Sequence, residues 1–164
     1  MKIRNYNSKD IETLTKLIFK FKNEESAYDK EPNITGLKDF GAAENYLDKL
    51  IKDVEEKEGY FFVAEIEGEI VGFVMGIIER YKDLSVLVTL EMSEQDIGWV
   101  GVLYVIDNYR GKGLGRELLA KAEQYCKDNG CNILKLNVLS ENPAVSNYVN
   151  GGYDVNCHEM FKKL

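Results

Sequence analysis

The chain has 164 residues and a mass of 18.7 kDa, which is the size of a single domain. Apolar residues make up 45% of the chain and charged residues 30%, with 14 glycines and two prolines, and this composition excludes a disordered or collagen-like protein. The 21 basic and 28 acidic residues give a net charge of −7, which disfavours general binding to nucleic acid.

The sequence also lacks the usual signs of export, membrane insertion and metal binding. No apolar run is long enough to cross a bilayer, and the first residues have no apolar stretch typical of a signal peptide. The cysteines Cys126, Cys131 and Cys157 are odd in number and form no C-x-x-C pair, which indicates a reducing compartment. We therefore expect a cytoplasmic protein without a membrane span or a metal site.

The first half of the chain predicts a short strand, two amphipathic helices and a β-hairpin. Apolar residues recur at helical spacing in both helices, and the acidic stretch 23–41 between them loses this period, which indicates an exposed connection. Glu67-Gly68 is the turn of the hairpin. The predicted strands are 1–6, Tyr60–Ile66 and Ile70–Ile78, and the predicted helices are 11–21 and 43–54.

The second half predicts alternating strands and helices. The segment Leu84–Leu90 fits either a short strand or a helical piece. Asn142 and Pro143 fit the N-cap and the first position of a short helix that ends at Gly151-Gly152. The other elements are two buried strands, Trp99–Val105 and Ile133–Val138, a helix from Gly115 to Asn129, and a closing strand pair over Tyr153–Lys162. This order is that of a mixed α/β fold, and we expect one domain over residues 1–164.

A glycine-rich loop between the strand at 99–105 and the helix that follows it is the most informative segment. Gly111, Gly113 and Gly115 allow a tight turn that brings backbone N–H groups together at a helix N-terminus, where an anion is favoured. Basic residues flank them. The pattern matches neither G-x-x-x-x-G-K-[ST] nor G-x-G-x-x-G, but it predicts a phosphate or pyrophosphate cradle. The alternative is a glycine-rich turn that binds no ligand.

Two segments together resemble the signature of the GCN5-related N-acetyltransferase (GNAT) superfamily. The first contains Leu103-Tyr104-Val105, the loop 109–115 and Leu118-Leu119, and the second contains Leu136-x-Val138, Asn142, Ala144, Tyr148 and Gly152-Tyr153. The order of elements fits the family over nearly the whole chain. The resemblance implies a GNAT-like mixed, mostly antiparallel twisted sheet with flanking helices and two splayed parallel central strands, here Trp99–Val105 and Ile133–Val138.

The resemblance implies that acetyl-CoA binds in the gap between these two strands. Backbone groups of the first strand would pair with the pantetheine arm, and the loop N–H groups would hold the pyrophosphate. The implied cofactor-binding residues are Leu103, Tyr104, Val105, Arg110, Gly111, Lys112, Gly113, Leu114, Gly115, Arg116 and Asn142.

The implied reaction is attack of a neutral amine on the thioester, and Tyr148 stands where the family has the acid that protonates the leaving thiolate. A tyrosine that only packs on a short helix is the alternative. Asn142 and Tyr148 are six positions apart where the family more often has seven, and we expect Tyr148 to keep its place. Asp107 replaces a frequent proline.

The positions where the family usually carries its general base are Trp99 and Asn137 here, and neither is a carboxylate. Asp96, Glu79 and Glu91 are candidates that would act through water. The missing base leaves a second class of function open, an acyl-CoA-binding sensor with little turnover. Transfer of another acyl group, or transfer to a hydroxyl, is a third alternative.

Four carboxylates within 24–31 favour a cationic amine as the acceptor, either a small molecule or a protein, although a merely solvated loop fits equally well. Asn137 disfavours the subgroup that uses a glutamate there to modify protein N-termini. We expect neither nucleic acid nor a membrane as partner. The C-terminal strands and Leu84–Leu90 are candidate seams of a homodimer.

Overall fold

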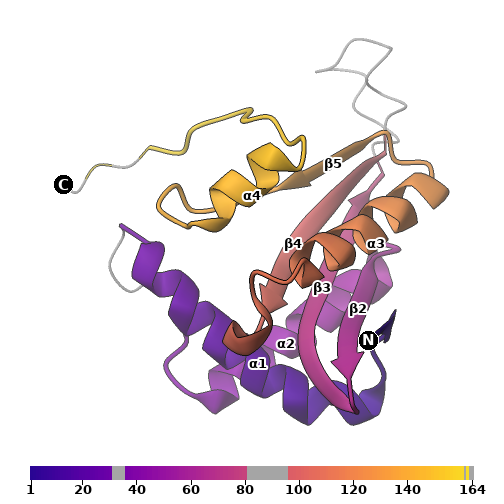
Figure 1. Ribbon diagram of the computed structural model, residues 1–164, viewed down its shortest axis with the longest axis vertical. Helices are drawn as coiled ribbons and strands as arrows, with labels where there is room; N and C mark the ends of the chain where they lie inside the picture. Colours follow the sequence, from indigo (N-terminus) through magenta and orange to yellow (C-terminus); the bar gives the residue numbers. More distant parts are fainter. Residues whose placement is uncertain (31–35, 81–95, 161, 163–164) are drawn as a thin grey trace.

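The computed structural model describes residues 1–30, 36–80, 96–160 and 162. Its centre is a five-stranded sheet in the order β1-β2-β3-β4-β5, in which neighbouring strands are antiparallel except for the parallel pair β4 and β5 (Figure 1). The strands are β1 (Lys2–Asn5), β2 (Tyr60–Ile66), β3 (Glu69–Glu79), β4 (Ile97–Val105) and β5 (Ile133–Leu136). The mixed, mostly antiparallel sheet that we predicted is therefore confirmed.

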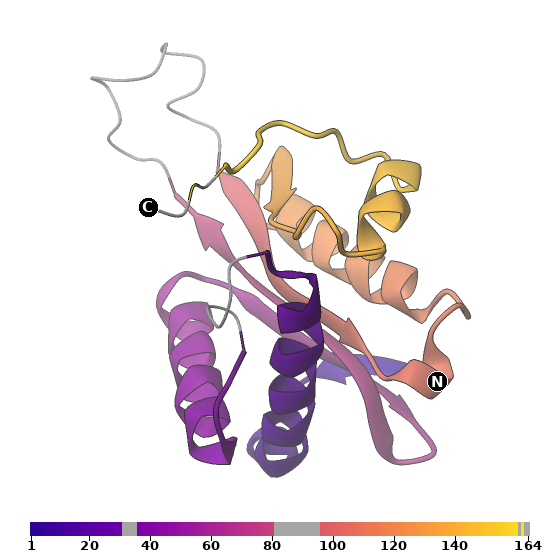
Figure 2. The same cartoon turned by 90° about the vertical axis from the view of Figure 1, so that its left-hand side faces the viewer.

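Helices cover both faces of this sheet. Figure 2 shows α1 (Ile11–Glu25) and α2 (Phe40–Glu56) on one face and α3 (Leu114–Asp128) on the other, while α4 (Ala144–Asn150) follows β5. Short 3₁₀ turns precede α1, follow it and precede the glycine loop, at Ser8–Asp10, Ser26–Tyr28 and Asp107–Tyr109. Within the part of the chain that the structure describes, no helix is long and apolar enough to cross a bilayer.

The alternation of side chains along the strands creates a hydrophobic core on each face of the sheet. On the α1/α2 face, Phe73 and Val63 are fully buried among residues that include Leu14. On the α3 face, Val74 packs in the cluster that contains Leu118. Full burial of one such side chain stabilises the folded state by about 1.5–3 kcal/mol. The two core layers therefore stabilise the sheet from both faces.

A β-bulge interrupts the pairing of β3 with β4 and divides β4 into two parts. Met75 pairs with Val102 and Gly76 pairs with Val100, so Gly101 is an extra residue on β4. On its other edge, β4 is paired with β5 only as far as Val100, opposite Leu136. Beyond the bulge β4 continues without β5, and this parting is the predicted splay.

The structure corrects several predictions about single elements. The connection after α1 starts later than residue 23, because α1 continues to Glu25. The strand β5 is only partly buried and lies at the edge of the sheet, and the C-terminal half of β4 is buried mainly on one face. The segment Leu84–Leu90 lies outside the described residues.

The predicted closing strand pair over Tyr153–Lys162 is wrong for the residues described there. Residues 153–160 form neither helix nor strand, and the apolar side chains of Val155 and Met160 are 66% and 89% exposed. The segment alternates like a strand but contains no Gly, Pro or Asn-Gly pair at which two strands could turn. β5 is therefore an edge strand of the described sheet, not a central one.

Candidate functional site

The glycine loop joins β4 to α3, and its backbone conformation depends on glycine. Gly111 and Gly113 have φ angles of +73° and +86°, in the left-handed region that other residues avoid. A Cβ placed on either would meet no heavy atom within 4 Å, so the space beside the loop is open. The first hydrogen bond of α3 runs from the Glu117 N–H to the Gly113 carbonyl, and the N–H groups before it lie at the positive end of the helix. This open turn fits a pyrophosphate.

All three basic residues near the loop, Arg110, Lys112 and Arg116, are exposed. The Lys112 ammonium donates to the Asn108 carbonyl at 2.9 Å while lying 5.3 Å from the centre of the Tyr109 ring. Lys112 and Arg116 add positive charge at the helix N-terminus, where the loop N–H groups converge.

The third basic residue, Arg110, is held by the protein itself. Its guanidinium donates to the Val105 carbonyl at 2.7 Å and forms ion pairs with Glu24 at 2.6 Å and Asp107 at 2.7 Å. It also lies 5.3 Å from the centre of the Tyr104 ring. Arg110 thus joins the end of β4 to α1, a contact that we did not predict, and its role in cofactor binding stays a prediction.

Two of the four carboxylates that we predicted in an exposed acidic connection, Glu24 and Glu25, have structural partners, while Glu31 lies outside the described residues. Glu24 lies on α1 and accepts hydrogen bonds from Arg110 and from the Tyr104 hydroxyl, the latter at 2.9 Å. Glu25, also on α1, pairs with Lys22 at 2.5 Å. These two charges are therefore neutralised, and they contribute little to attracting a cationic acceptor.

The backbone predicted to pair with the pantetheine arm lies beyond the bulge. Leu103, Tyr104 and Val105 pair with β3 on one side and have passed the last pairing with β5 on the other. The Tyr104 side chain is buried on the α1 face. The parting of β4 and β5 therefore presents this backbone edge as the sequence predicted, although the Val105 carbonyl already accepts the bond from Arg110.

The second motif forms the start and the middle of α4. The prediction of Asn142 as the N-cap and Pro143 as the first helical residue is wrong by one position, because α4 begins at Ala144 and Pro143 is its N-cap. The Asn142 side-chain oxygen still accepts the Ala144 N–H at 2.9 Å, so a contact between Asn142 and a cofactor would come from its amide nitrogen. Tyr148 is partly buried and lies edge-on to Tyr153, with ring centres 5.8 Å apart. Burial, followed by the charge of Glu25, raises the pKa of the Tyr148 phenol.

A pocket of about 340 Å³ opens on the α2 face where β4 leaves β5. Its polar groups include Asp53 of α2, Glu79 of β3 and Asn137, which follows β5. The Trp99 indole N–H donates to the Glu79 carboxylate at 2.8 Å. Sequence reasoning named Glu79 only as one of three candidate bases. Its contact with Trp99 joins two strands through residues 20 positions apart, so local spacing could not reveal it.

The other candidate bases have different surroundings. Asp96 pairs with Arg80, which also binds Glu58 and the Asn129 carbonyl beside α3. Glu91 lies outside the described residues. Glu79 is therefore the candidate that the structure places in the pocket.

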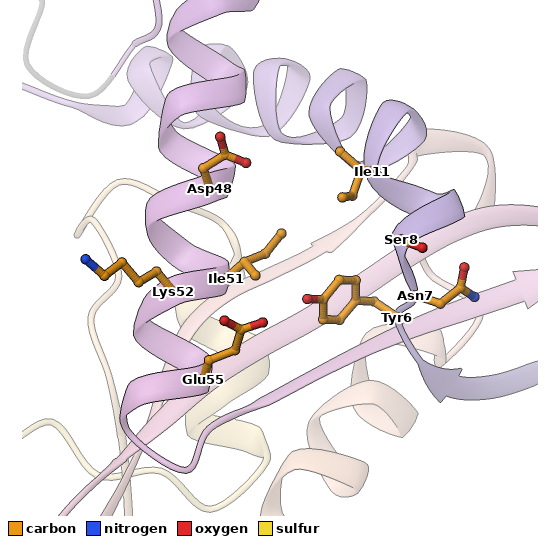
Figure 3. Close-up of a pocket in the computed structure, with 8 residues that line it drawn as sticks. All are labelled: Tyr6, Asn7, Ser8, Ile11, Asp48, Ile51, Lys52 and Glu55. Carbon is orange, nitrogen blue, oxygen red and sulfur yellow. The ribbon is translucent and has the colours of Figure 1, made fainter.

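A larger cavity of about 540 Å³ lies between the start of α1 and α2 (Figure 3). Glu24, which binds the glycine loop, is near the opposite end of α1, about 20 Å away along the helix. This cavity is thus separate from the cradle. It is lined by Tyr6, Asn7, Ser8, Ile11, Asp48, Ile51, Lys52 and Glu55. Among the described residues, no three His, Cys, Asp or Glu side chains gather as a metal site.

Comparisons with known proteins identify the family. An N-alpha-acetyltransferase from Sulfurisphaera tokodaii is 32% identical over 107 residues, covering 63% of this chain and 62% of its own length. An uncharacterized N-acetyltransferase from Methanocaldococcus jannaschii is 29% identical over 154 residues, covering 93% and 60%. The chain therefore spans about three fifths of the length of these curated relatives.

A solved structure of a candidate acetyl transferase from Pyrococcus furiosus superposes with a TM-score of 0.71 at 26% identity, covering 99% of both chains. The model of the acetyltransferase (GNAT) family matches residues 21–150, which include the end of α1, the glycine loop and α4. This match covers well over half of the sequence, and the chain therefore belongs to the acetyltransferase (GNAT) family.

Proposed function

We propose that this chain transfers an acetyl group from acetyl-CoA to an amine of a small molecule or a protein, by direct attack in a ternary complex. The observation that carries this proposal is the open glycine cradle at the start of α3, found inside the segment that matches the family. We propose further that residues 1–164 act as one domain and that the protein works in the cytoplasm.

The chain's own groups fit acetyl-CoA as the acyl donor. The N–H groups of Gly111, Lys112, Gly113, Leu114, Gly115 and Arg116 would hold the pyrophosphate, and the backbone of Leu103, Tyr104 and Val105 would bind the pantetheine arm as an added strand. Arg110 and Asn142 would support the two ends of this path. When bound, acetyl-CoA supplies an activated acetyl group.

The reaction requires three groups: one that accepts a proton from the amine, one that donates a hydrogen bond to the oxyanion, and one that donates a proton to the leaving thiolate. The amine nitrogen forms a bond to the carbonyl carbon, the carbon–sulfur bond breaks, and the electron pair leaves on sulfur. A backbone N–H near Val105 would stabilise the oxyanion, which is the family's usual arrangement. The Tyr148 phenol would give its proton to the sulfur, and its raised pKa keeps it protonated at neutral pH.

A cationic amine remains our proposal for the acceptor, but for a reason other than the acidic connection. Glu24 and Glu25 form ion pairs with Arg110 and Lys22, and the carboxylates of Asp53 and Glu79 line the pocket beside the parting of β4 and β5. One relative is named an N-alpha-acetyltransferase, so a peptide α-amine belongs among the acceptors to be tested.

The first experiment measures thiol release from acetyl-CoA across a panel of amines, together with acetyl-CoA binding by calorimetry. Amine-dependent release is the expected result. Tight binding without release for any amine would favour the alternative that Trp99 and Asn137 suggest, an acyl-CoA-binding sensor that lacks the usual base. Absence of acetyl-CoA binding would contradict the cradle itself.

Replacement of Tyr148 by Phe tests the proton donor. We expect kcat to fall about 100-fold while the affinity for acetyl-CoA stays within about twofold, because only the leaving thiolate needs the phenol. The matched control is Tyr153→Phe, since Tyr153 contacts the Tyr148 ring and loses the same atom. Equal kcat values for Y148F and the unmodified protein would assign Tyr148 a packing role.

A further inference from the structure

The pair formed by Trp99 and Glu79 has a fixed geometry. The indole N–H donates to the carboxylate at 2.8 Å, and the Trp99 backbone carbonyl accepts the Tyr60 hydroxyl at 3.1 Å. The Lys135 ammonium lies 5.7 Å from the centre of the indole ring. Contacts from β2, β3 and β5 thus fix the tryptophan, and the tryptophan in turn directs the carboxylate of Glu79.

This pair forms part of the wall of the pocket where β4 leaves β5. Asp53 of α2 supplies a second carboxylate, and its ion pair with Lys57 is loose at 3.8 Å. Two carboxylates beside apolar side chains are suited to a primary ammonium on an apolar stem. The apolar part of the wall consists of Leu50, Met75, Ile77, Trp99 and Val100.

The size of the pocket limits what can enter. A cavity of about 340 Å³ is near the lower end of the range for small-molecule sites. It can hold one aminoalkyl chain, whether this belongs to a free amine, a lysine side chain or the first residue of a peptide. These sources share one chemistry, an ammonium that must lose a proton before it can attack a thioester.

We propose that Glu79 binds the ammonium of the acceptor and removes its proton, and that Trp99 is the residue that positions Glu79. This inference rests on the proposed function. The proton passes from the ammonium nitrogen to a Glu79 carboxylate oxygen, the nitrogen keeps the electron pair and attacks, and Glu79 later releases the proton to water. Glu79 thereby supplies a carboxylate beside the position where Trp99 replaces the family's usual base.

Trp99 is the only tryptophan of the chain, so its fluorescence reports on this pocket without any need for turnover. The experiment titrates n-butylamine, spermidine, a lysine peptide and a peptide with a free N-terminus into the unmodified protein, E79Q and E69Q. Glu69 is the matched control, because it is an exposed glutamate at the other end of the same strand. We expect a fluorescence change in the unmodified protein and in E69Q, with affinity at least 10-fold weaker in E79Q.

The same proteins are then assayed for thiol release as a function of pH. We expect kcat/KM for the amine to fall about 100-fold or more in E79Q, with unchanged acetyl-CoA affinity and partial recovery at high pH, where the amine is already neutral. In W99F we expect kcat to fall about 10-fold while the KM for acetyl-CoA is unchanged, because the Glu79 carboxylate loses the donor that positions it. The titratable groups around this pair include, among the described residues, Asp53, Lys57, Lys135 and Tyr60.

The outcomes separate the two proposals. An E79Q variant whose kcat/KM equals that of the unmodified protein at every pH, and whose affinity for the amine is also unchanged, would overturn the role of Glu79. Amine binding that depends on Glu79, in a protein that binds no acetyl-CoA, would overturn the proposed function and the proton transfer but support the ammonium site. The amine that binds most tightly identifies the source of the acceptor.

Discussion

The strands β2, β3 and β4 approach one another closely around Gly76. A Cβ at this position would overlap the Trp99 carbonyl oxygen and the Tyr60 hydroxyl. Only glycine at position 76 therefore allows the bulge that contains Gly101 on the neighbouring strand. It also allows the hydrogen bond that the Tyr60 hydroxyl donates to the Trp99 carbonyl. The shape of the pocket wall thus depends on the absence of one side chain.

Substitution of Gly76 by Ala should lower the free energy of unfolding by about 1–3 kcal/mol, because the backbone of β4 must move to admit the methyl group. Urea unfolding measures this change, and Gly101→Ala is the control on the opposite strand of the same bulge. A Cβ at Gly101 would meet only the Met75 carbonyl oxygen at an ordinary 3.7 Å. Equal losses in the two variants would contradict this account.

At the scale of elements, the junction between β1 and α1 depends on one buried carboxylate. Asp10 is 7% exposed and accepts two hydrogen bonds from Arg4, at 2.7 and 3.0 Å, and one from the Asn7 N–H at 2.8 Å. Arg4 also binds Glu65 of β2. The bonds from Arg4, chiefly, lower the pKa of Asp10 below its ordinary value of 3.8.

This lowered pKa predicts a pH-dependent stability. The unfolded chain binds the Asp10 proton more readily than the folded chain does, so the stabilisation is complete above about pH 4 and is lost as the pH falls through the folded pKa. Asp10→Asn should lower the free energy of unfolding by about 2–3 kcal/mol at pH 7. Urea unfolding from pH 7 to about pH 2.5 should show the gap between the two proteins closing, and a constant gap would contradict the prediction.

The elements that could be predicted from the sequence are those that depend on local patterns. Periodicity identified the helices and most strands, and the glycine pattern identified the open turn before α3, because these are local signals. The bonds of Glu24 to Arg110 and Tyr104 join residues at least 80 positions apart, so Glu24 looked like a solvated loop residue. The bulge was also hidden, since β4 reads as a continuous apolar strand with or without one extra residue.

At the scale of the whole molecule, a ligand that binds only the folded chain must raise its thermal stability. At a concentration 100-fold above Kd, acetyl-CoA should add about 2.7 kcal/mol to the free energy of unfolding. For a chain of this size, that corresponds to a rise in Tm of roughly 5–10 °C.

Gly113→Val should abolish this rise, because a β-branched residue is strained at a φ of +86° and its side chain would occupy the cradle. Gly130, at the far end of α3, has the same φ and equally open surroundings. Gly130→Val is therefore a control that carries the same strain. Both variants should melt below the unmodified protein, but only the Gly130 variant should keep the rise in Tm, as differential scanning fluorimetry would reveal.

The bulge in β4 also determines which side chains of the strand face each side of the sheet. Before it, odd-numbered Trp99 faces α2, and after it, even-numbered Val102 and Tyr104 face α1 and α2. If Gly101 were paired regularly instead of forming a bulge, all nine residues of β4 would alternate with a strict period of two, and the two faces of its second half would be exchanged. Tyr104 would then point toward α3, and Glu24 would lose the hydroxyl that it binds. Because the bulge accommodates Gly101 outside the regular pairing, one strand presents Trp99 to the pocket and Tyr104 to α1 on the same side of the sheet.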